Sequence, residues 1–292
     1  MKAYAARVAA IVCAAALAMV MVGCSQETYT PESGTAAVSS PTIGEDGVLR
    51  VGVNSSSAPL AGESTTTGNI VGIDVDIAAA LADELGLKVE IVDVGDDAAT
   101  ALSEGTVDIV LGVEVSNTSE TYWLSDTYLD TAIAFFALSS ASAEVPTNVS
   151  TLTVAAQVAS QSAWSVANLF DQAVLSTTTS LEDAFTALGS GTVSYVASDA
   201  IIGTFAAYSI DLDVQIVALL EDASGYCVAV LSTHTELQTA VSEALATICD
   251  NGIVDLIEKK WLGTAIDLSS TAVVETTTDE STDETTEETA TE

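Results

Sequence analysis

The chain has 292 residues, of which 42 are Asp or Glu and only 6 are Lys or Arg, so its formal net charge is −36 at pH 7. So acidic a protein repels phosphate backbones, which excludes nucleic acid as a partner. The sequence contains a single His, no Ser/His/Asp or Cys/His set, no glycine-rich phosphate loop and no spacing of His and Cys ligands. We therefore expect no catalysis, no cofactor and no metal site.

The first segment has the features of a lipoprotein export signal. Lys2 and Arg7 precede an uncharged apolar run over residues 8–22. This run is shorter than a typical membrane-spanning helix and has the length of a signal-peptide core. The run ends in Met-Val-Gly-Cys24, which resembles a bacterial lipobox. We predict a signal peptide over residues 1–23, a lipid on Cys24 and a flexible tether over residues 24–45. The protein would then be anchored to the outer face of a cell membrane. The alternative is an ordinary cleaved signal with Cys24 as a stray thiol.

Strands and helices alternate after the tether. The pattern predicts a strand at 49–53, a helix at 74–85 that stops at Gly86, and a strand at 88–92. Ile73, Ile77, Leu81 and Leu85 lie four residues apart, which predicts one helix face that covers a sheet.

A fourteen-residue stretch then occurs twice. Residues 97–110 return as residues 183–196 without a gap, with nine of the fourteen positions identical. Each copy predicts a short helix, a glycine that ends it and a strand. We interpret the repeat as one unit built twice, which indicates two similar lobes. Open α/β sheets bind ligands beyond the carboxyl ends of their strands, so Gly112 to Glu114 and Ser198 with Asp199 become candidate site residues.

The second half continues the alternation and ends in an acidic tail. We predict a strand near 154–156, a helix from Leu181 with Ser180 as its N-cap, a strand at 228–231, a helix at about 236–248 and a last helix ending near Leu262. Residues 266–292 are predicted to be a disordered, solvating tail rich in Thr and Glu. A tail that interacts with a surface layer or with cations is the alternative.

Four cysteines give one candidate disulfide. Cys13 leaves with the signal peptide and Cys24 takes the lipid, which leaves Cys227 and Cys249. An exported protein favours a disulfide between them, which would close a loop of about twenty residues. The alternative is two small buried thiols.

Seven short motifs appear in an order typical of one protein family. They are Leu49-Arg-Val-Gly-Val53, Gly72-Ile-Asp-Val-Asp-Ile-Ala78, Glu104-Gly-Thr-Val-Asp-Ile109, Leu124-Ser-Asp-Thr-Tyr128, Gly191 through Asp199, Gly225-Tyr226 and Lys260-Trp-Leu-Gly263. In this order the chain resembles the polar-amino-acid group of bacterial extracellular solute-binding proteins over residues 46–265.

The resemblance implies an α/β fold of the periplasmic-binding-protein type. It is a two-lobed clamshell in which each lobe is a mixed sheet flanked by helices and two strand crossovers form the hinge. Lobe 1 would comprise residues 46–136 plus 226–265 and lobe 2 residues 137–225, with crossovers near 135–138 and 224–228. The resemblance further implies a monomer that captures a small solute and delivers it to an ABC permease in the membrane.

The family's ligand-binding residues carry over unevenly. An Asp that holds the ligand's ammonium group is matched by Asp199, which could instead be a helix N-cap. The Arg that pairs with the ligand's carboxylate is absent, since no Arg follows Arg50, and Glu114 stands where the family has a Thr. The alternative is that Glu114 points to solvent. The ligand-binding residues we predict are Asn54, Ser57, Gly112, Glu114, Thr118, Ser160, Gln161 and Asp199.

Two carboxylates without an opposing Arg favour a cationic, amine-bearing solute. Ser160 and Gln161 begin a predicted helix whose N-terminus favours an anion, so a zwitterion bound in an altered orientation remains an alternative ligand.

The same fold leaves two alternative functions: a ligand-sensing or surface-interaction lipoprotein without transport, or an enzyme like a cyclohexadienyl dehydratase. Asp96, Asp97 and Glu114 could meet a hard cation, although nothing enforces the number of ligands.

Overall fold

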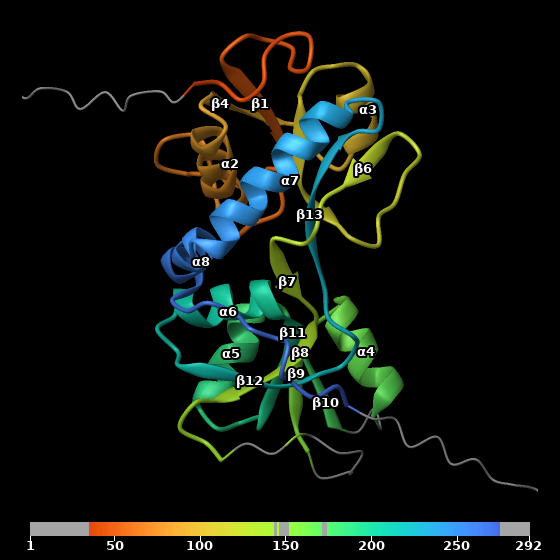
Figure 1. Ribbon diagram of the computed structural model, residues 1–292. Helices are drawn as coiled ribbons and strands as arrows, with labels where there is room; N and C mark the ends of the chain where they lie inside the picture. Colours follow the sequence, from red (N-terminus) through yellow and green to blue (C-terminus); the bar gives the residue numbers. More distant parts are fainter. Residues whose placement is uncertain (1–34, 143–144, 146–151, 171–173, 275–292) are drawn as a thin grey trace, which may run out of the picture. The chain divides into compact units, whose positions relative to one another are not determined.

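The computed structural model describes residues 35–142, 145, 152–170 and 174–274. Within them the chain builds two large β-sheets, each with helices on both faces, and one two-stranded ribbon (Figure 1). The predicted signal peptide, the lipobox with Cys24, and residues 275–292 of the predicted tail lie outside the described residues. Within the described part, no helix has the length and hydropathy that crossing a membrane requires.

The first sheet has the strand order β4-β1-β5-β13-β6, with β7 also paired to β13. Neighbours β4, β1 and β5 run parallel, and β13 runs antiparallel to β5, β6 and β7. The strands are β1 (Val48–Val53), β4 (Lys88–Asp93), β5 (Ile109–Glu114), β6 (Tyr122–Leu124), β7 (Leu129–Thr131) and β13 (Ser224–Leu231).

Helices cover both faces of this sheet. One core cluster joins it to α2 (Ile73–Glu84), α7 (Thr235–Asp250) and α8 (Ile253–Leu262), and a second joins its other face to α3 (Ala98–Ser103). Ile73, Ile77, Leu81 and Leu85 are all buried in the first cluster, which confirms the predicted face of α2. A two-stranded ribbon, β2 (Gly62–Glu63) and β3 (Ile70–Val71), precedes α2.

The second sheet has the order β10-β9-β11-β8-β12. Its strands are β8 (Ile133–Leu138), β9 (Val154–Gln157), β10 (Leu175–Thr178), β11 (Tyr195–Asp199) and β12 (Val214–Leu219). Helices α5 (Leu181–Gly189) and α6 (Ala200–Ser209) pack on one face, and α4 (Gln161–Leu169) packs on the other.

The repeat is built twice, once in each sheet. Its first copy forms α3 and β5, and its second copy forms α5 and β11. In each copy the glycine after the helix, Gly105 or Gly191, has a positive φ of 68° or 73°. The next threonine, Thr106 or Thr192, donates its backbone N–H to an alanine carbonyl in the helix at 3.1 or 2.9 Å. The same left-handed turn thus leads into a central strand of each sheet.

The connections between the sheets differ from the predicted positions. The first lies between β7 and β8, earlier than expected, because Phe135 and Phe136 are fully buried in the second sheet's core. The second lies between β12 and β13, just before the predicted crossover. The predicted lobe boundary at residue 136 thus falls inside β8.

A third connection follows α8. Leu268 is buried in the second sheet's core, and Val273 forms a parallel bridge with Leu219 of β12. The prediction of a disordered tail from residue 266 is therefore wrong for residues 266–274, which pack through their apolar side chains.

The segment before β1 is also part of the fold. Val38 and Ile43 are buried in the first sheet's core, and the backbone N–H of Ala37 donates to the carbonyl of Leu85 at 2.9 Å. The predicted tether is therefore wrong for residues 38–45, where two apolar side chains fix the chain against α2 and α7.

The predicted disulfide is wrong, because Cys227 and Cys249 are both free. Tyr226 and Val228 of β13 belong to the core cluster that contains α7, and successive side chains of a strand point to opposite faces. Cys227 therefore points away from the face on which α7 packs. Cys249 lies exposed near the end of α7.

Candidate functional site

Two adjoining cavities lie at the carboxyl ends of strands in the two sheets. The larger, of about 560 Å³, is lined by the segments that follow β1 and β4 and by the end of β5. The smaller, of about 230 Å³, is lined by the end of β11 and the start of α4. Glu114, Ile202 and Tyr226 line both cavities, so the two are contiguous. The end of each repeat copy therefore contributes to the same hollow, at the strand ends where α/β sheets bind ligands.

Most of the predicted ligand-binding residues line these cavities. The larger cavity has Asn54, Ser57, Gly112 and Glu114, and the smaller has Ser160, Gln161 and Asp199 together with Glu114. Thr118 is exposed and lines neither. Asn117, one residue earlier, lines the larger cavity instead. Its backbone N–H donates to the carbonyl of Glu114 at 2.9 Å, and this hydrogen bond closes a turn of the chain.

Asp199 ends β11 and caps α6. Its Oδ1 accepts from the backbone N–H groups of Ile201 and Ile202, both at 2.9 Å, and its Oδ2 accepts from the hydroxyl of Thr131 at 2.5 Å. Burial raises the pKa of Asp199, the three hydrogen bonds lower it, and the nearby Glu114 raises it. The N-cap interpretation therefore holds, and Oδ2, which accepts a single hydrogen bond, still has a lone pair for a further donor.

Glu114 ends β5 with its side chain exposed to the cavities. Its carboxylate accepts a long hydrogen bond from the hydroxyl of Ser116, at 3.4 Å. Tyr226 of β13 lines both cavities. Burial raises its pKa most, followed by the charges of Asp199, Glu114 and Asp74, so all three carboxylates act on one ring at the junction of the two cavities.

Asp74 is a cavity residue that the sequence did not predict. It lies in the first turn of α2, is 2% exposed, and lines the larger cavity. Its Oδ1 accepts from the hydroxyl of Tyr128 at 2.6 Å, and that hydroxyl accepts from the backbone N–H of Gly112 at 2.8 Å. Burial raises the pKa of Asp74 to about 7, against a smaller lowering by Tyr128. The sequence holds one indication that Asp74 is buried: it lies three residues before Ile77, on the apolar face of the helix.

Two further polar groups shape the cavity walls. The side-chain amide of Asn54 donates to Asp96, which also lines the larger cavity. Ser160 caps α4, where its hydroxyl accepts from the backbone N–H of Ala163 at 3.0 Å. The start of α4 thus offers backbone N–H groups beside Asp199.

The charge balance of the cavities is one-sided. Asp74, Asp96, Glu114 and Asp199 line them, and none of the described lining residues is Lys, Arg or His. The two ion pairs of the described chain join Arg50 to Asp108 and Lys260 to Asp76, and none of these four residues lines either cavity. Among the described residues no group of three or more His, Cys, Asp or Glu is arranged to hold a metal ion.

Solved structures share this fold. An ancestral cationic amino acid solute-binding protein is 27% identical over 74% of this chain and 96% of its own, with a TM-score of 0.60. The L-cystine solute receptor of Neisseria gonorrhoeae, unliganded and open, is 20% identical over 75% of this chain and 94% of its own, with a TM-score of 0.64. A polar amino acid ABC uptake transporter substrate-binding protein from Streptococcus thermophilus is 18% identical over 75% and 87%, with a TM-score of 0.67.

No curated protein sequence matches the chain. The sequence of residues 49–264 matches the family described as bacterial extracellular solute-binding proteins, family 3. That match spans both sheets, the repeat and every residue that lines the two cavities. With its two-lobed periplasmic-binding-protein fold, the chain therefore belongs to family 3 of the bacterial extracellular solute-binding proteins.

Proposed function

We propose that this protein captures a small solute bearing an amine or another cationic group and delivers it to an ABC importer. The observation that carries the proposal is the convergence of four carboxylates on two contiguous cavities whose described lining contains no cationic side chain. Like charges that share a poorly solvated site repel one another, and a cationic ligand removes that repulsion. An anionic ligand would add to it.

Asp199 and Glu114 are the proposed ammonium contacts from the second and the first sheet. Asp199 is held in place by Thr131 and by two backbone N–H groups, so the free lone pair of its Oδ2 is already oriented. Among the described residues, the Glu114 side chain has only a long contact with Ser116, so it is free to turn toward a ligand. A charge-assisted hydrogen bond to each is stronger than a neutral one.

The ligand's other end meets a different environment. The first turn of α4, beside Ser160 and Gln161, offers the positive end of a helix to a carboxylate or hydroxyl group. A zwitterion would therefore bind with its cationic group among the acids and its anionic group at α4. The ancestral relative at 27% identity, named for cationic amino acids, supports the choice of solute class.

A thermal-shift screen tests the solute class. Arginine, lysine, agmatine and putrescine are compared with glutamate, glutamine and short peptides. A ligand at 100 times its Kd adds about 2.7 kcal/mol to the stability of the folded state, which raises Tm by several degrees. We expect cationic solutes to stabilise the wild type, and Asp199→Ala and Glu114→Gln to weaken that effect. Stabilisation by acidic or neutral amino acids that Asp199→Ala leaves unchanged would refute the assignment.

The anchor and the transport role belong to the same proposal. Labelling of growing cells with a palmitate analogue should mark the wild type but not Cys24→Ala.

Solute uptake by cells should require both this protein and a membrane permease with its ATPase. If deletion of this protein abolishes signalling but not uptake, the sensing role is favoured. The solute recovered after incubation should be chemically unchanged, whereas a dehydrated product would favour the enzyme alternative.

A further inference from the structure

The proposed ammonium contacts do not use Asp74, the most deeply buried acid of the larger cavity. The residue is 2% exposed, yet no described cation is paired with it. The nearest acid along α2, Asp76, pairs instead with Lys260 at 2.5 Å and accepts from the ring N–H of Trp261 at 2.6 Å. An ionised carboxylate buried without a cation is costly, so the environment of Asp74 needs a separate explanation.

The hydrogen bonds of Asp74 engage one of its two oxygens. Tyr128 donates its hydroxyl proton to Oδ1, because that hydroxyl already accepts from Gly112. Among the described residues, no donor reaches Oδ2. Oδ2 lies against Gly112, where an added Cβ would come within 2.6 Å of it, and both residues line the larger cavity. The free oxygen therefore lies at the wall of the cavity that Glu114 also lines.

We propose that Oδ2 of Asp74 is a further contact for the ligand's cationic group, and that ligand binding exchanges the proton of this carboxyl for the cation. In the protonated form of the empty protein the acid carries its proton on Oδ2, since Oδ1 accepts from Tyr128. On binding, the O–H bond of Asp74 breaks, the proton passes to solvent, and the ligand's N–H donates to the resulting carboxylate. The role of Asp74 rests on the proposed function, because an anionic solute would have no use for this exchange.

The surroundings of Asp74 set the direction of its pH dependence. Burial holds its pKa near 7, and Tyr128 donates a hydrogen bond to it. The other titratable groups that line the same cavity are Glu114 at the end of β5, Asp96 after β4 and Tyr226 of β13. None of these supplies a positive charge. A pKa of about 7 means that the carboxyl is about nine-tenths protonated at pH 6 and about one-tenth at pH 8. Because only the ionised form binds the cation, Kd should weaken about tenfold from pH 8 to pH 6.

Titration calorimetry tests the exchange. The probe is whichever of arginine, lysine, agmatine and putrescine binds most tightly, because their cationic groups keep their protons across this pH range. At pH 7, titrations in two buffers of different ionisation enthalpy should report release of about half a proton per bound ligand, rising to about 0.9 at pH 6. Asp74→Asn should bind more weakly at pH 8 and lose both the proton release and the pH dependence.

Two further variants keep the test specific. Asp76→Asn, a change of the same kind two residues along α2 and outside the cavities, should retain the wild-type pH profile. Tyr128→Phe removes the hydrogen bond that lowers the pKa of Asp74, so the midpoint of its pH profile should move to higher pH. This shift tests the role of Asp74 even if Asp74→Asn fails to fold.

The outcomes separate the inference from the proposed function. If the wild type binds the probe with no proton release and an equal Kd at pH 6 and 8, the role of Asp74 is refuted and the proposed function stands. If Asp199→Asn, but not Asp74→Asn, abolishes the pH dependence, the titrating group is Asp199 and the inference is again wrong. If no cationic probe binds at any pH, the proposed function fails and the exchange fails with it.

Discussion

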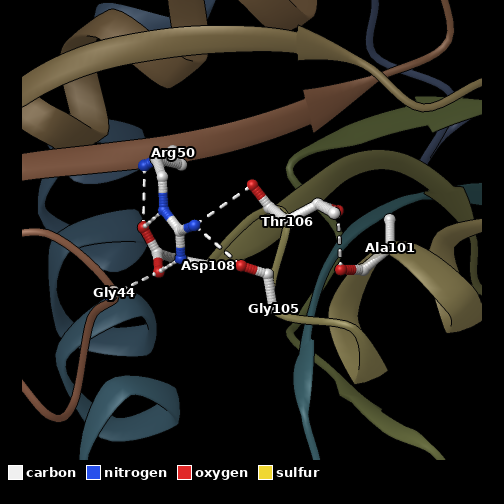
Figure 2. A network of polar contacts seen from close by, with 6 residues as sticks. All are labelled: Gly44, Arg50, Ala101, Gly105, Thr106 and Asp108. Atoms are coloured by element: carbon white, nitrogen blue, oxygen red, sulfur yellow. Dashed lines mark hydrogen bonds and ion pairs between the residues drawn. The ribbon is translucent and has the colours of Figure 1, made fainter.

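The Asp108 carboxylate joins three segments of the first sheet, and its removal should be among the most destabilising single changes outside the cavities (Figure 2). It accepts from Nη2 and Nε of Arg50 at 2.7 and 3.2 Å, from the backbone N–H of Arg50 at 2.8 Å and from that of Gly44 at 2.9 Å. Arg50 also donates to the carbonyls of Gly105 and Thr106 at 2.7 and 3.3 Å. The pair thus ties the segment before β1 to the turn of the first repeat copy.

The size of the effect follows from what Asp108→Ala leaves behind. The Arg50 side chain is only 20% exposed and would lose its counter-charge, while two backbone N–H groups would lose their acceptor. Removing one partner of a buried pair costs about 3–5 kcal/mol, which already includes much of the cost of the unpaired donors. We therefore expect a loss of about 3–5 kcal/mol, a large fraction of the usual 5–15 kcal/mol of a domain.

Urea unfolding followed by far-UV circular dichroism measures this loss. Lys260→Ala is the matched control, because it removes an exposed pair with 58% and 28% of its side chains accessible, and it should cost less than about 1 kcal/mol. Arg50→Met should cost less than Asp108→Ala, since Asp108 then keeps both backbone donors. If Asp108→Ala proved no more destabilising than Lys260→Ala, the reasoning would be refuted. Ligand affinity should stay unchanged, because neither Arg50 nor Asp108 lines a cavity.

Three other outcomes are expected. The pKa of Asp74 is raised to about 7 in the folded protein, so its ionisation opposes folding as pH rises from about 4 to 7. In urea unfolding, the free energy of unfolding of Asp74→Asn should therefore gain about 2.5 kcal/mol relative to that of the wild type between pH 5 and pH 8. An equal difference between the two proteins at both pH values would contradict this. Leu268→Ala should lower the unfolding free energy by about 2–5 kcal/mol, because Leu268 is buried in the second sheet's core; a loss below 0.5 kcal/mol would mean that residues 266–274 are not part of it. In the folded protein a maleimide should label the exposed Cys249 and not the buried Cys227, and mass spectrometry that finds neither thiol labelled would support a disulfide after all.

The sequence predicted those features that depend on local pattern. The apolar spacing of Ile73 to Leu85 determines which face of α2 is buried, and a glycine with positive φ must end the short helix of each repeat copy, so both could be recognised without a structure. The same repeat led to the ends of β5 and β11, and hence to Glu114 and Asp199, because open sheets bind ligands there.

What the sequence did not predict depends on orientation across long distances. Both faces of β13 are buried, so no alternation of polar and apolar residues shows that Cys227 points away from α7. The segments that carry Val38 and Leu268 are short and irregular, and only contacts with distant core residues fix them. The place of Asp74 on the apolar face of α2 indicates that it is buried, but not that its carboxyl meets Tyr128 and lies against Gly112 at a cavity wall, because both residues lie far along the chain.

The four carboxylates of the cavities can each be explained locally, but their proximity cannot. Asp199 caps α6, Asp96 accepts from Asn54, Glu114 contacts Ser116, and Asp74 accepts from Tyr128. None of these partners is a cation, so nothing in the described lining balances the negative charge of these acids. The charge of Glu114 raises the pKa of Asp199, and this repulsion persists in the empty protein and falls when a cation enters. A fold gains nothing from such an arrangement, whereas a binding protein gains both affinity for a cation and discrimination against anions.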